Sequence, residues 1–402
     1  MHKVVGKLGR VEFIALVAGL IMINAFAIDI MLPGLQQIGE SLGEADPNRR
    51  QLVIPAYMLG FGVLQLVFGP LADRFGRRVP LLCGVGIYML AALSANFVTD
   101  FNALIVLRFL QGAGAAASAV IGLALVRDLF IGDEMAKTLS LIFMVMMVSP
   151  ILAPALGQFL LTVMNWQGLF AFMAGLGGLV WLWIYFRLPE TLKFENRRAF
   201  TLKSIVEGFG IVFGNRVSLS YIMATALLFG ALMGFLTSAQ QIYVVQFNMG
   251  AWFPAFFAVG GVAAALSGFA NSQLVSRFGM KKLSSIALTI FAANSVLILV
   301  LSLAGIMHVW LFLGLSLIWF ISFNFIMANF GALAMMPLGE VAGTAASTQG
   351  FLQMVVGASI GAVIGQFYNG TTVPLALGFV ILSILAGIVV SFGTPQRGSI
   401  QC

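Results

Sequence analysis

One carboxylate, Asp29, lies inside an apolar run that is long enough to cross a membrane. The run extends from Phe13 to Leu32, spans twenty residues and carries no other charge. A charged side chain at membrane depth costs about 3 kcal/mol or more, so it usually carries protons, coordinates an ion or binds a substrate. No other Asp or Glu of this chain lies deep in an apolar run. If the protein couples its activity to protons, Asp29 is the first residue to consider.

The expected burial of this carboxyl bears on whether it can bind and release a proton. A rise of about 1.5 Å per residue from the cytoplasmic side places Asp29 in the outer half of the bilayer. A low-dielectric environment disfavours the charged form of a carboxyl, which makes reversible protonation feasible. The alternative is a structural aspartate that is hydrogen-bonded to backbone or to Asn24. The cost of burial favours the functional interpretation.

Arg108 is the one basic residue deep in an apolar run. Its helix is expected to enter from the outside, which places Arg108 at a depth comparable with that of Asp29. A nearby arginine would favour the ionised form of Asp29 and would link protonation to ligand binding or to movement of Arg108. The alternative is an arginine that caps or bridges helices. We predict that Asp29 and Arg108 form a proton-coupling site, with the proton as coupling ion and no other cofactor.

The composition indicates the surroundings of this site. The chain has 402 residues, of which 60% are hydrophobic and 9% are charged, whereas soluble domains are about 25% charged. This is the composition of a polytopic membrane protein, so a lipid bilayer is the expected environment. The net charge of +7 is attributed to Lys and Arg in cytoplasmic loops. We expect no nucleic-acid partner, because the chain has no basic soluble module with interleaved aromatic residues.

Charged residues divide the chain into apolar stretches. A helix that spans about 30 Å of hydrocarbon needs about 20 residues, so the four longest stretches each hold two helices. The stretches are 13–32, 51–72, 79–99, 109–126, 138–186, 217–276, 283–339 and 341–396. Polar or glycine-containing breaks fall at 165–168, 248–250, 305–308 and 369–372. The predicted fold is all-α, with twelve transmembrane helices.

The distribution of Lys and Arg predicts the orientation. These residues cluster in every second loop starting from the N-terminus, and the opposite side holds only Arg49 and Arg50. Both termini are therefore predicted to be cytoplasmic. The midpoint stretch 187–216 contains six basic and three acidic residues. We predict a six-helix half over 1–188, a cytoplasmic linker over 189–214 and a second six-helix half over 215–402.

An internal repeat supports two pseudo-symmetric halves. The sequence Arg-Phe-Gly at 74–76 recurs 203 residues later at 277–279, at the equivalent point of the second half. Two six-helix repeats related by an axis along the membrane normal are a known transporter architecture. Ser276 stands where the first copy has Asp73, so the halves are similar and not interchangeable.

Four stretches resemble a known family. Gly69–Arg78 is similar to the loop 2–3 signature of the major facilitator superfamily, which reads Gly, three residues, Asp-Arg, one residue and Gly-Arg-Arg. The other three are Ala27–Pro33 at the end of the first helix, Leu107–Gly112 with Leu125–Asp128 in the fourth, and Ala342–Gln353 in the eleventh. Together they resemble the bicyclomycin/chloramphenicol-resistance (Bcr/CflA) family of drug–proton antiporters, over nearly the whole chain.

The resemblance implies a monomer in the bacterial inner membrane that exports small, drug-like molecules in exchange for protons by alternating access. It also implies that the motif arginine, Arg108, takes part in proton transfer. Helix 5 departs from the family pattern of Gly-Pro, two residues and Gly-Gly, because Ala153 and Gln158 replace glycines. The glutamine weakens the inference of antiport over symport. The remaining Pro150, Pro154 and Gly157 are predicted to form a hinge in this helix.

Interfacial and cavity residues complete the predicted site. A conformational latch at the cytoplasmic face is predicted, in which Asp73 can sit at a helix N-terminus and pair with basic groups across the halves. Its members are Gly69, Asp73, Arg74, Gly76, Arg77, Arg78, Arg127 and Asp128. Polar residues within helices must face protein or water, so some of them either line a substrate cavity or bridge helices. The cavity candidates are Asn24, Tyr57, Gln111, Gln240, Gln241, Asn324, Asn329 and Gln353.

Other functions remain as alternatives. The sequence contains no P-loop, no metal-ligand cluster and no nucleophile triad, so an enzyme is not expected. An exporter of an endogenous metabolite, such as an amino acid, a sugar or a metallophore, would share the same fold. A proton-coupled importer would also share it. A receptor or structural membrane protein is disfavoured by the paired halves and the two deep charges.

Overall fold

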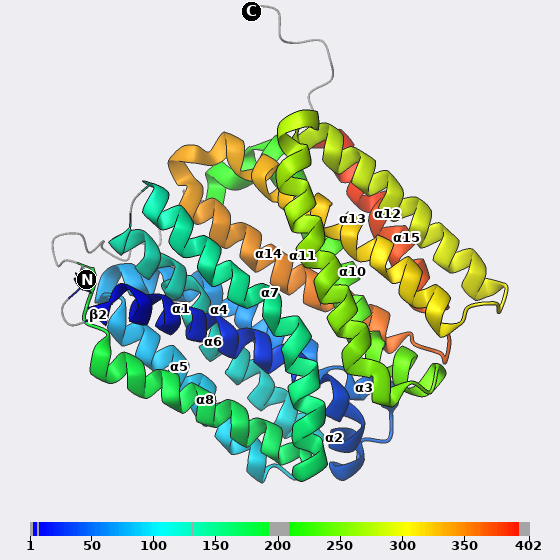
Figure 1. The fold of residues 1–402 in the computed structure, drawn as a ribbon, viewed down its shortest axis with the longest axis horizontal. Helices are drawn as coiled ribbons and strands as arrows, with labels where there is room; N and C mark the ends of the chain where they lie inside the picture. Colours follow the sequence, from blue (N-terminus) through cyan, green and yellow to red (C-terminus); the bar gives the residue numbers. More distant parts are fainter. Residues whose placement is uncertain (1–2, 6–7, 131, 193–208, 394–402) are drawn as a thin grey trace, which may run out of the picture. The chain divides into compact units, whose positions relative to one another are not determined.

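A computed structural model describes residues 3–5, 8–130, 132–192 and 209–393, without the side chains of 3–5, 132–133, 136–137, 140, 143–151 and 339–344. The chain forms two compact units, Met1–Phe200 and Thr201–Cys402 (Figure 1). Each unit is described by itself. Most of the predicted linker 189–214 lies outside the described residues, because 193–208 are not among them.

The first unit begins with a short antiparallel strand pair that the sequence did not predict, in which Val5 lies opposite Leu8. Helices then follow one another to the end of the unit, with α6 packed against α4 and α5, and α1 packed against α6, α7 and α8 (Figure 1). The elements are β1 (Lys3–Val5), β2 (Leu8–Gly9), α1 (Arg10–Asp29), η1 (Leu32–Gly34), α2 (Leu35–Ser41), α3 (Pro47–Arg50), α4 (Val53–Phe75), α5 (Arg78–Ser94), η2 (Ala95–Phe97), α6 (Phe101–Leu129), α7 (Gly132–Val163) and α8 (Trp166–Arg187).

The second unit is helical throughout its described part. Helix α10 packs against α13, α14 and α15, and Trp319 lies at the centre with rings of Phe291 and Phe379 5.4 and 4.7 Å away. The elements are α10 (Arg216–Gln240), the π-helical η4 (Gln241–Gln246), η5 (Gly250–Trp252), α11 (Phe253–Phe278), α12 (Met280–Leu303), α13 (Val309–Met335), η6 (Met336–Val341), α14 (Ala342–Gln366) and α15 (Val373–Gly393).

The predicted number of spanning helices is confirmed. Among the described residues, eleven helices are long and apolar enough to cross a membrane. The twelfth is the 32-residue α7, whose stretch Leu152–Val163 is apolar. The four predicted breaks all separate helices, and three contain a residue with left-handed backbone, namely Asn248, Gly305 and Gly370. Such a residue commonly ends a helix.

Helix α1 ends at Asp29 for a reason that is visible in the sequence. Its last backbone bond runs from the Ile30 N–H to the Phe26 carbonyl, at 3.1 Å. Continuing the helix would require the N–H of residue 33 to bond the carbonyl of Asp29, but residue 33 is proline and has no N–H. The chain instead turns through Met31 into the 3-10 turn η1. Asp29 therefore lies at a break between two helical segments.

The internal repeat is also present in the backbone. Helix α4 ends at Phe75 and is followed by Gly76 with φ of 90°, and α11 ends at Phe278 and is followed by Gly279 with φ of 76°. A positive φ suits glycine because it has no Cβ. The glycine of each Arg-Phe-Gly copy therefore turns the chain from one spanning helix into the next.

Candidate functional site

Asp29 is buried, and no cation among the described residues of its unit pairs with it. Its exposed fraction is 7%, and it makes no ion pair or side-chain hydrogen bond with the described residues. The expected alternative, a bond to Asn24, is not formed, because the Asn24 amide is engaged elsewhere. A buried charge without a partner is costly, so protonation of this carboxyl removes a large desolvation penalty. The site is therefore suited to taking up and releasing a proton.

Arg108 lies close to the break in α1 but does not pair with Asp29. Its guanidinium donates from Nη2 to the Ala27 carbonyl at 2.8 Å and from Nε to the Val53 carbonyl at 3.1 Å. It also donates from Nη1 to Oε1 of Gln111 at 2.7 Å. The last four carbonyls of a helix lack intrahelical partners, and Ala27 belongs to this group in α1. Arg108 is thus a fully buried bridge between α1, α4 and α6.

A polar network surrounds this arginine. Its guanidinium lies 4.6 Å from the ring centroid of Tyr57, a distance that allows a cation–π interaction. The Tyr57 hydroxyl donates to Oδ1 of Asn24 at 3.1 Å, and Nδ2 of Asn24 donates to Oγ of Ser118 at 2.5 Å. Close helix approach brings these groups together, since a Cβ on Gly112 would overlap the Tyr57 carbonyl oxygen. Asn24, Tyr57 and Gln111 therefore hold Arg108 and α1 in place within this unit.

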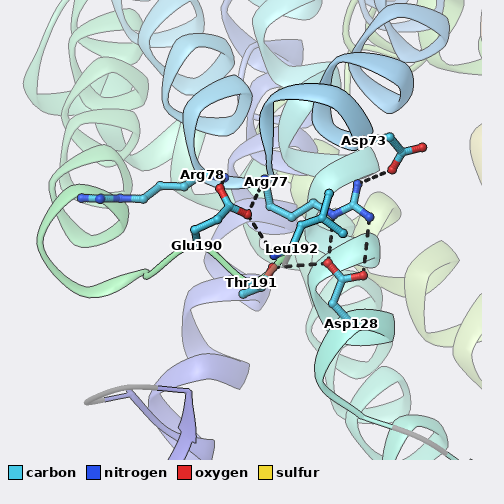
Figure 2. Close-up of polar contacts among 7 residues, drawn as sticks. All are labelled: Asp73, Arg77, Arg78, Asp128, Glu190, Thr191 and Leu192. Carbon is cyan, nitrogen blue, oxygen red and sulfur yellow. Dashed lines mark hydrogen bonds and ion pairs between the residues drawn. The ribbon is translucent and has the colours of Figure 1, made fainter. Parts of the chain in front are cut away.

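Arg77 is the centre of a cluster at the ends of α4 and α6 (Figure 2). Its Nη1 lies 2.6 Å from Oδ1 of Asp73, and its Nε lies 2.9 Å from Oδ2 of Asp128. Burial by itself would lower the pKa of Arg77, but the hydrogen bonds to Asp128 and Asp73 outweigh burial and raise the pKa. The cation is therefore permanent, and it joins the last turns of two spanning helices.

Glu190 belongs to this cluster and was not among the predicted residues. Its carboxylate accepts hydrogen bonds from the backbone N–H of Arg77 at 2.8 Å and of Arg78 at 3.2 Å (Figure 2). These are the first N–H groups of α5, which attract an anion. Thr191 adds a bond to Asp128 at 3.3 Å. The signal in the sequence is a lone acid at Pro189-Glu190-Thr191, directly after the last span of the first half and among basic residues.

The predicted latch residues do not all take the positions that the sequence suggested. Asp73 lies in the last turn of α4 and not at a helix N-terminus, and the carboxylate at the N-terminus of α5 is that of Glu190. Arg74 stacks on Phe75, and Arg78 donates to the Tyr185 carbonyl. Asp128 pairs with Arg77 and not with its neighbour Arg127, which is exposed. A Cβ on Gly69 would make only ordinary contact, 3.9 Å from Cγ1 of Val120.

The second half lacks the corresponding ion pair. Ser276 occupies the place of Asp73, and its hydroxyl bonds the carbonyl of Gln273 in its own helix. Met280 occupies the place of Arg77. A Cβ on Gly279 would meet nothing within 4 Å, whereas a Cβ on Gly76 would overlap the Glu190 carboxylate. Among the described residues, the cluster around Arg77 is therefore a property of the first unit alone.

Helix α7 contacts the break in α1. A Cβ on Gly157 would overlap the carbonyl oxygen of Ile30 and would lie 3.2 Å from Cγ of Pro33. Pro154 is buried one turn earlier in α7. Pro150, the third predicted hinge residue, lies in the stretch whose side chains are outside the described residues.

Comparison with known proteins identifies the family. Residues 14–362 match the family model described as the Major Facilitator Superfamily. The chain belongs to the Major Facilitator Superfamily. It is 30% identical over 379 residues to the "Bicyclomycin resistance protein homolog" of Haemophilus influenzae, covering 93% of this chain and 94% of the relative. It is 28% identical to "Multidrug resistance protein D" of Escherichia coli (strain K12), covering 97% and 98%.

A solved structure agrees with this fold. The partially occluded inward-open xylose transporter XylE from E. coli aligns with a TM-score of 0.71 at 12% identity, covering 97% of this chain and 98% of that protein. At that identity the likeness establishes the fold alone. As a member of the Major Facilitator Superfamily, the chain is a multi-pass membrane transporter and not an enzyme.

The candidate cavity residues of the second half of this superfamily member differ in their surroundings. Asn329 is buried and donates to Oδ1 of Asn271 and to the Phe325 carbonyl, both at 2.7 Å. The Asn324 amide bonds the Phe320 carbonyl one turn back, at 2.9 Å. The three glutamines also lie on helical segments, two of them buried and one half-buried, namely Gln240, Gln241 and Gln353.

Proposed function

We propose that this protein is a proton-coupled antiporter that exports small, drug-like molecules from the cytoplasm of a bacterial cell across its inner membrane. The observation that carries the proposal is a buried carboxyl, Asp29, that has no counter-charge among the described residues of its unit. Membership of a transporter superfamily and likeness to bicyclomycin- and multidrug-resistance proteins support export of drug-like compounds.

The proposed cycle exchanges a proton for substrate at Asp29. When the site faces the cytoplasm, Asp29 releases its proton as the drug binds from the cytoplasm or the inner leaflet. When the site faces outward, protonation of Asp29 disfavours the drug and the drug leaves. Only interactions that differ between the two states can drive this exchange, and the charge of Asp29 is such a difference.

Arg108 has a supporting role in this cycle. Its three hydrogen bonds go to neutral acceptors on α1, α4 and α6, so the arginine fixes the broken end of α1 without neutralising Asp29. Its positive charge stays within the same helix bundle, where low dielectric strengthens electrostatic interactions. Movement of α1 relative to α4 would change the distance between this charge and the carboxyl.

The test is transport in proteoliposomes with an imposed pH gradient, across a small panel of antibiotics and dyes. The wild type is compared with Asp29→Asn, which keeps the shape of the side chain but cannot carry the proton, and with Asp29→Glu. We expect gradient-driven flux in the wild type, none in Asp29→Asn and partial flux in Asp29→Glu. Gradient-driven flux in Asp29→Asn at the wild-type level would refute the proposal.

A further inference from the structure

The break that follows Asp29 is closed on one side by helix α7. Ile30, Met31 and Leu32 are fully buried. Helix α7 approaches this turn at two levels. At the first, Gly157 lies against the backbone of Ile30, and at the second, Cδ1 of Leu161 lies 3.3 Å from the position that a Cβ on Gly34 would take.

The contact at Gly157 is one that a side chain would prevent. A Cβ there would overlap the Ile30 carbonyl oxygen and would come within 3.0 Å of its carbonyl carbon. The obstacle is backbone, so it cannot move aside by changing a rotamer. Helices in membranes approach this closely where the residue at the contact is small. The carbonyl in question belongs to the residue that directly follows Asp29.

We propose that Gly157 is a positioning residue for Asp29, through which α7 sets the geometry of the α1 break and thereby the placement of the carboxyl. The proposal rests on the proposed function in one respect, because it assigns this geometry to the same coupling site. The contact depends on shape and not on charge. Any group larger than hydrogen at position 157 displaces the chain immediately after Asp29.

The charged and titratable groups on the elements packed against α1 are few at this level. Helix α6 contributes Arg108, whose donors are engaged with Ala27, Val53 and Gln111. Tyr57 of α4 and Tyr88 of α5 are buried and donate to Oδ1 of Asn24 and to the Ile23 carbonyl. The stretch Leu152–Val163 of α7 contains no titratable residue, and α8 contains none before Tyr185. A shift in the protonation behaviour of Asp29 on substitution at Gly157 would therefore come from placement and not from a new charge.

The experiment measures Asp29 directly. A hydrophobic carbodiimide reacts with the protonated carboxyl, and mass spectrometry of the peptide containing Asp29 gives the labelling rate across pH. We expect Gly157→Ala to change the rate and to move the midpoint of its pH profile, beyond the spread of replicate measurements. An unchanged profile in a folded Gly157→Ala protein would overturn the proposal.

A matched control separates this effect from tight packing in general. Gly361 makes a comparable contact in the second unit, where a Cβ would overlap the Met233 side chain and lie 2.7 Å from its carbonyl carbon. Gly361→Ala is expected to leave the labelling profile of Asp29 at the wild-type position. An equal shift in both variants would also overturn the proposal, because the effect would then be a general loosening of the protein.

A second variant covers the case in which Gly157→Ala does not fold. Leu161→Ala removes bulk from the same face of α7 and loosens the contact with Gly34, and it is expected to change the labelling profile of Asp29 as well. In that case an unchanged profile in Leu161→Ala overturns the proposal. Labelling does not require transport. A result with Asp29→Asn that refutes the antiport proposal can therefore be told apart from a result that refutes the positioning role of Gly157.

Discussion

Arg108 of α6 contacts α1 at Ala27, two residues before Asp29, and yet no ion pair joins the two side chains. The arginine donates hydrogen bonds to the backbone carbonyls of Ala27 and Val53 and to the side-chain oxygen of Gln111. Bonds from a charged donor contribute about 1.5–3 kcal/mol each, so this bridge is a stable part of the first unit. Among the described residues, no ion pair holds the Asp29 carboxyl in the ionised form.

The bridge predicts a sharp difference between arginine and lysine. Arg108→Lys keeps the charge but cannot reach three acceptors with the geometry of the guanidinium fork. We expect a loss of about 2 kcal/mol in stability, seen as a lower melting temperature in detergent, together with at least about tenfold slower gradient-driven export. Arg216→Lys, at an exposed arginine outside the predicted latch, is the control and should behave as the wild type. Wild-type stability and export in Arg108→Lys would contradict the bridge.

Sequence could single out these residues but not their partners. Asp29 and Arg108 are conspicuous because each is the one charge of its sign in a long apolar run. The sequence predicted only that Arg108 lies at a depth comparable with that of Asp29, and the structure shows the arginine bridging helices. Two of its acceptors are backbone carbonyls. Because every residue has a backbone carbonyl, the residue types in the sequence do not identify these two partners.

At the scale of elements, the junction between α4 and α5 is formed by a glycine in the turn together with a carboxylate that is distant in the sequence. Gly76 turns the chain with a positive φ, and its lack of a side chain leaves room for Glu190 above the first N–H groups of α5. The repeat supplies an internal comparison, since Gly279 has the same backbone and open space around it.

This comparison yields a prediction about Gly76→Ala and Gly279→Ala. Both substitutions place a Cβ on extended backbone with positive φ, a conformation almost restricted to glycine, which costs about 1–3 kcal/mol. Gly76→Ala also forces the Glu190 carboxylate away from the N–H groups of Arg77 and Arg78, and hydrogen bonds to a charged group are worth about 1.5–3 kcal/mol. Thermal unfolding of the purified proteins should therefore show the lower melting temperature for Gly76→Ala.

A double substitution checks the cause of the difference. Removing the carboxylate with Glu190→Ala relieves the overlap, so the further cost of Gly76→Ala in that background should fall to that of Gly279→Ala. Non-additivity of this kind is expected for residues in contact. Equal melting temperatures for the two single glycine variants would show that Glu190 does not occupy this place in solution.

The elements themselves were largely predictable. Length, apolar runs and the positions of breaks gave twelve helices, because each spanning helix needs about 20 apolar residues. Pro33 marked the end of α1 through its missing N–H. The strand pair β1–β2 and the π-helical turn at Gln241–Gln246 were not predicted. They depend on local backbone pairing that leaves no periodic pattern in so few residues.

At the scale of the whole molecule, the distribution of Lys and Arg predicts which side of the membrane each loop faces. Single cysteines at Asn48→Cys and Arg198→Cys, in a background with Cys83→Ser and Cys402→Ser, can be tested in intact cells with a membrane-impermeant maleimide. We expect labelling of the first position and protection of the second until the cells are opened. The reverse pattern would invert the predicted orientation and with it the predicted direction of export.

The central claim concerns the exchange of protons for substrate, and proton movement tests it most directly. Proteoliposomes without a pH gradient are loaded with a pH-sensitive dye, and a substrate gradient is then imposed. We predict that protons move against the direction of substrate in the wild type and that Asp29→Asn shows no proton movement. Protons that travel with the substrate, or that move unchanged in Asp29→Asn, would contradict the account.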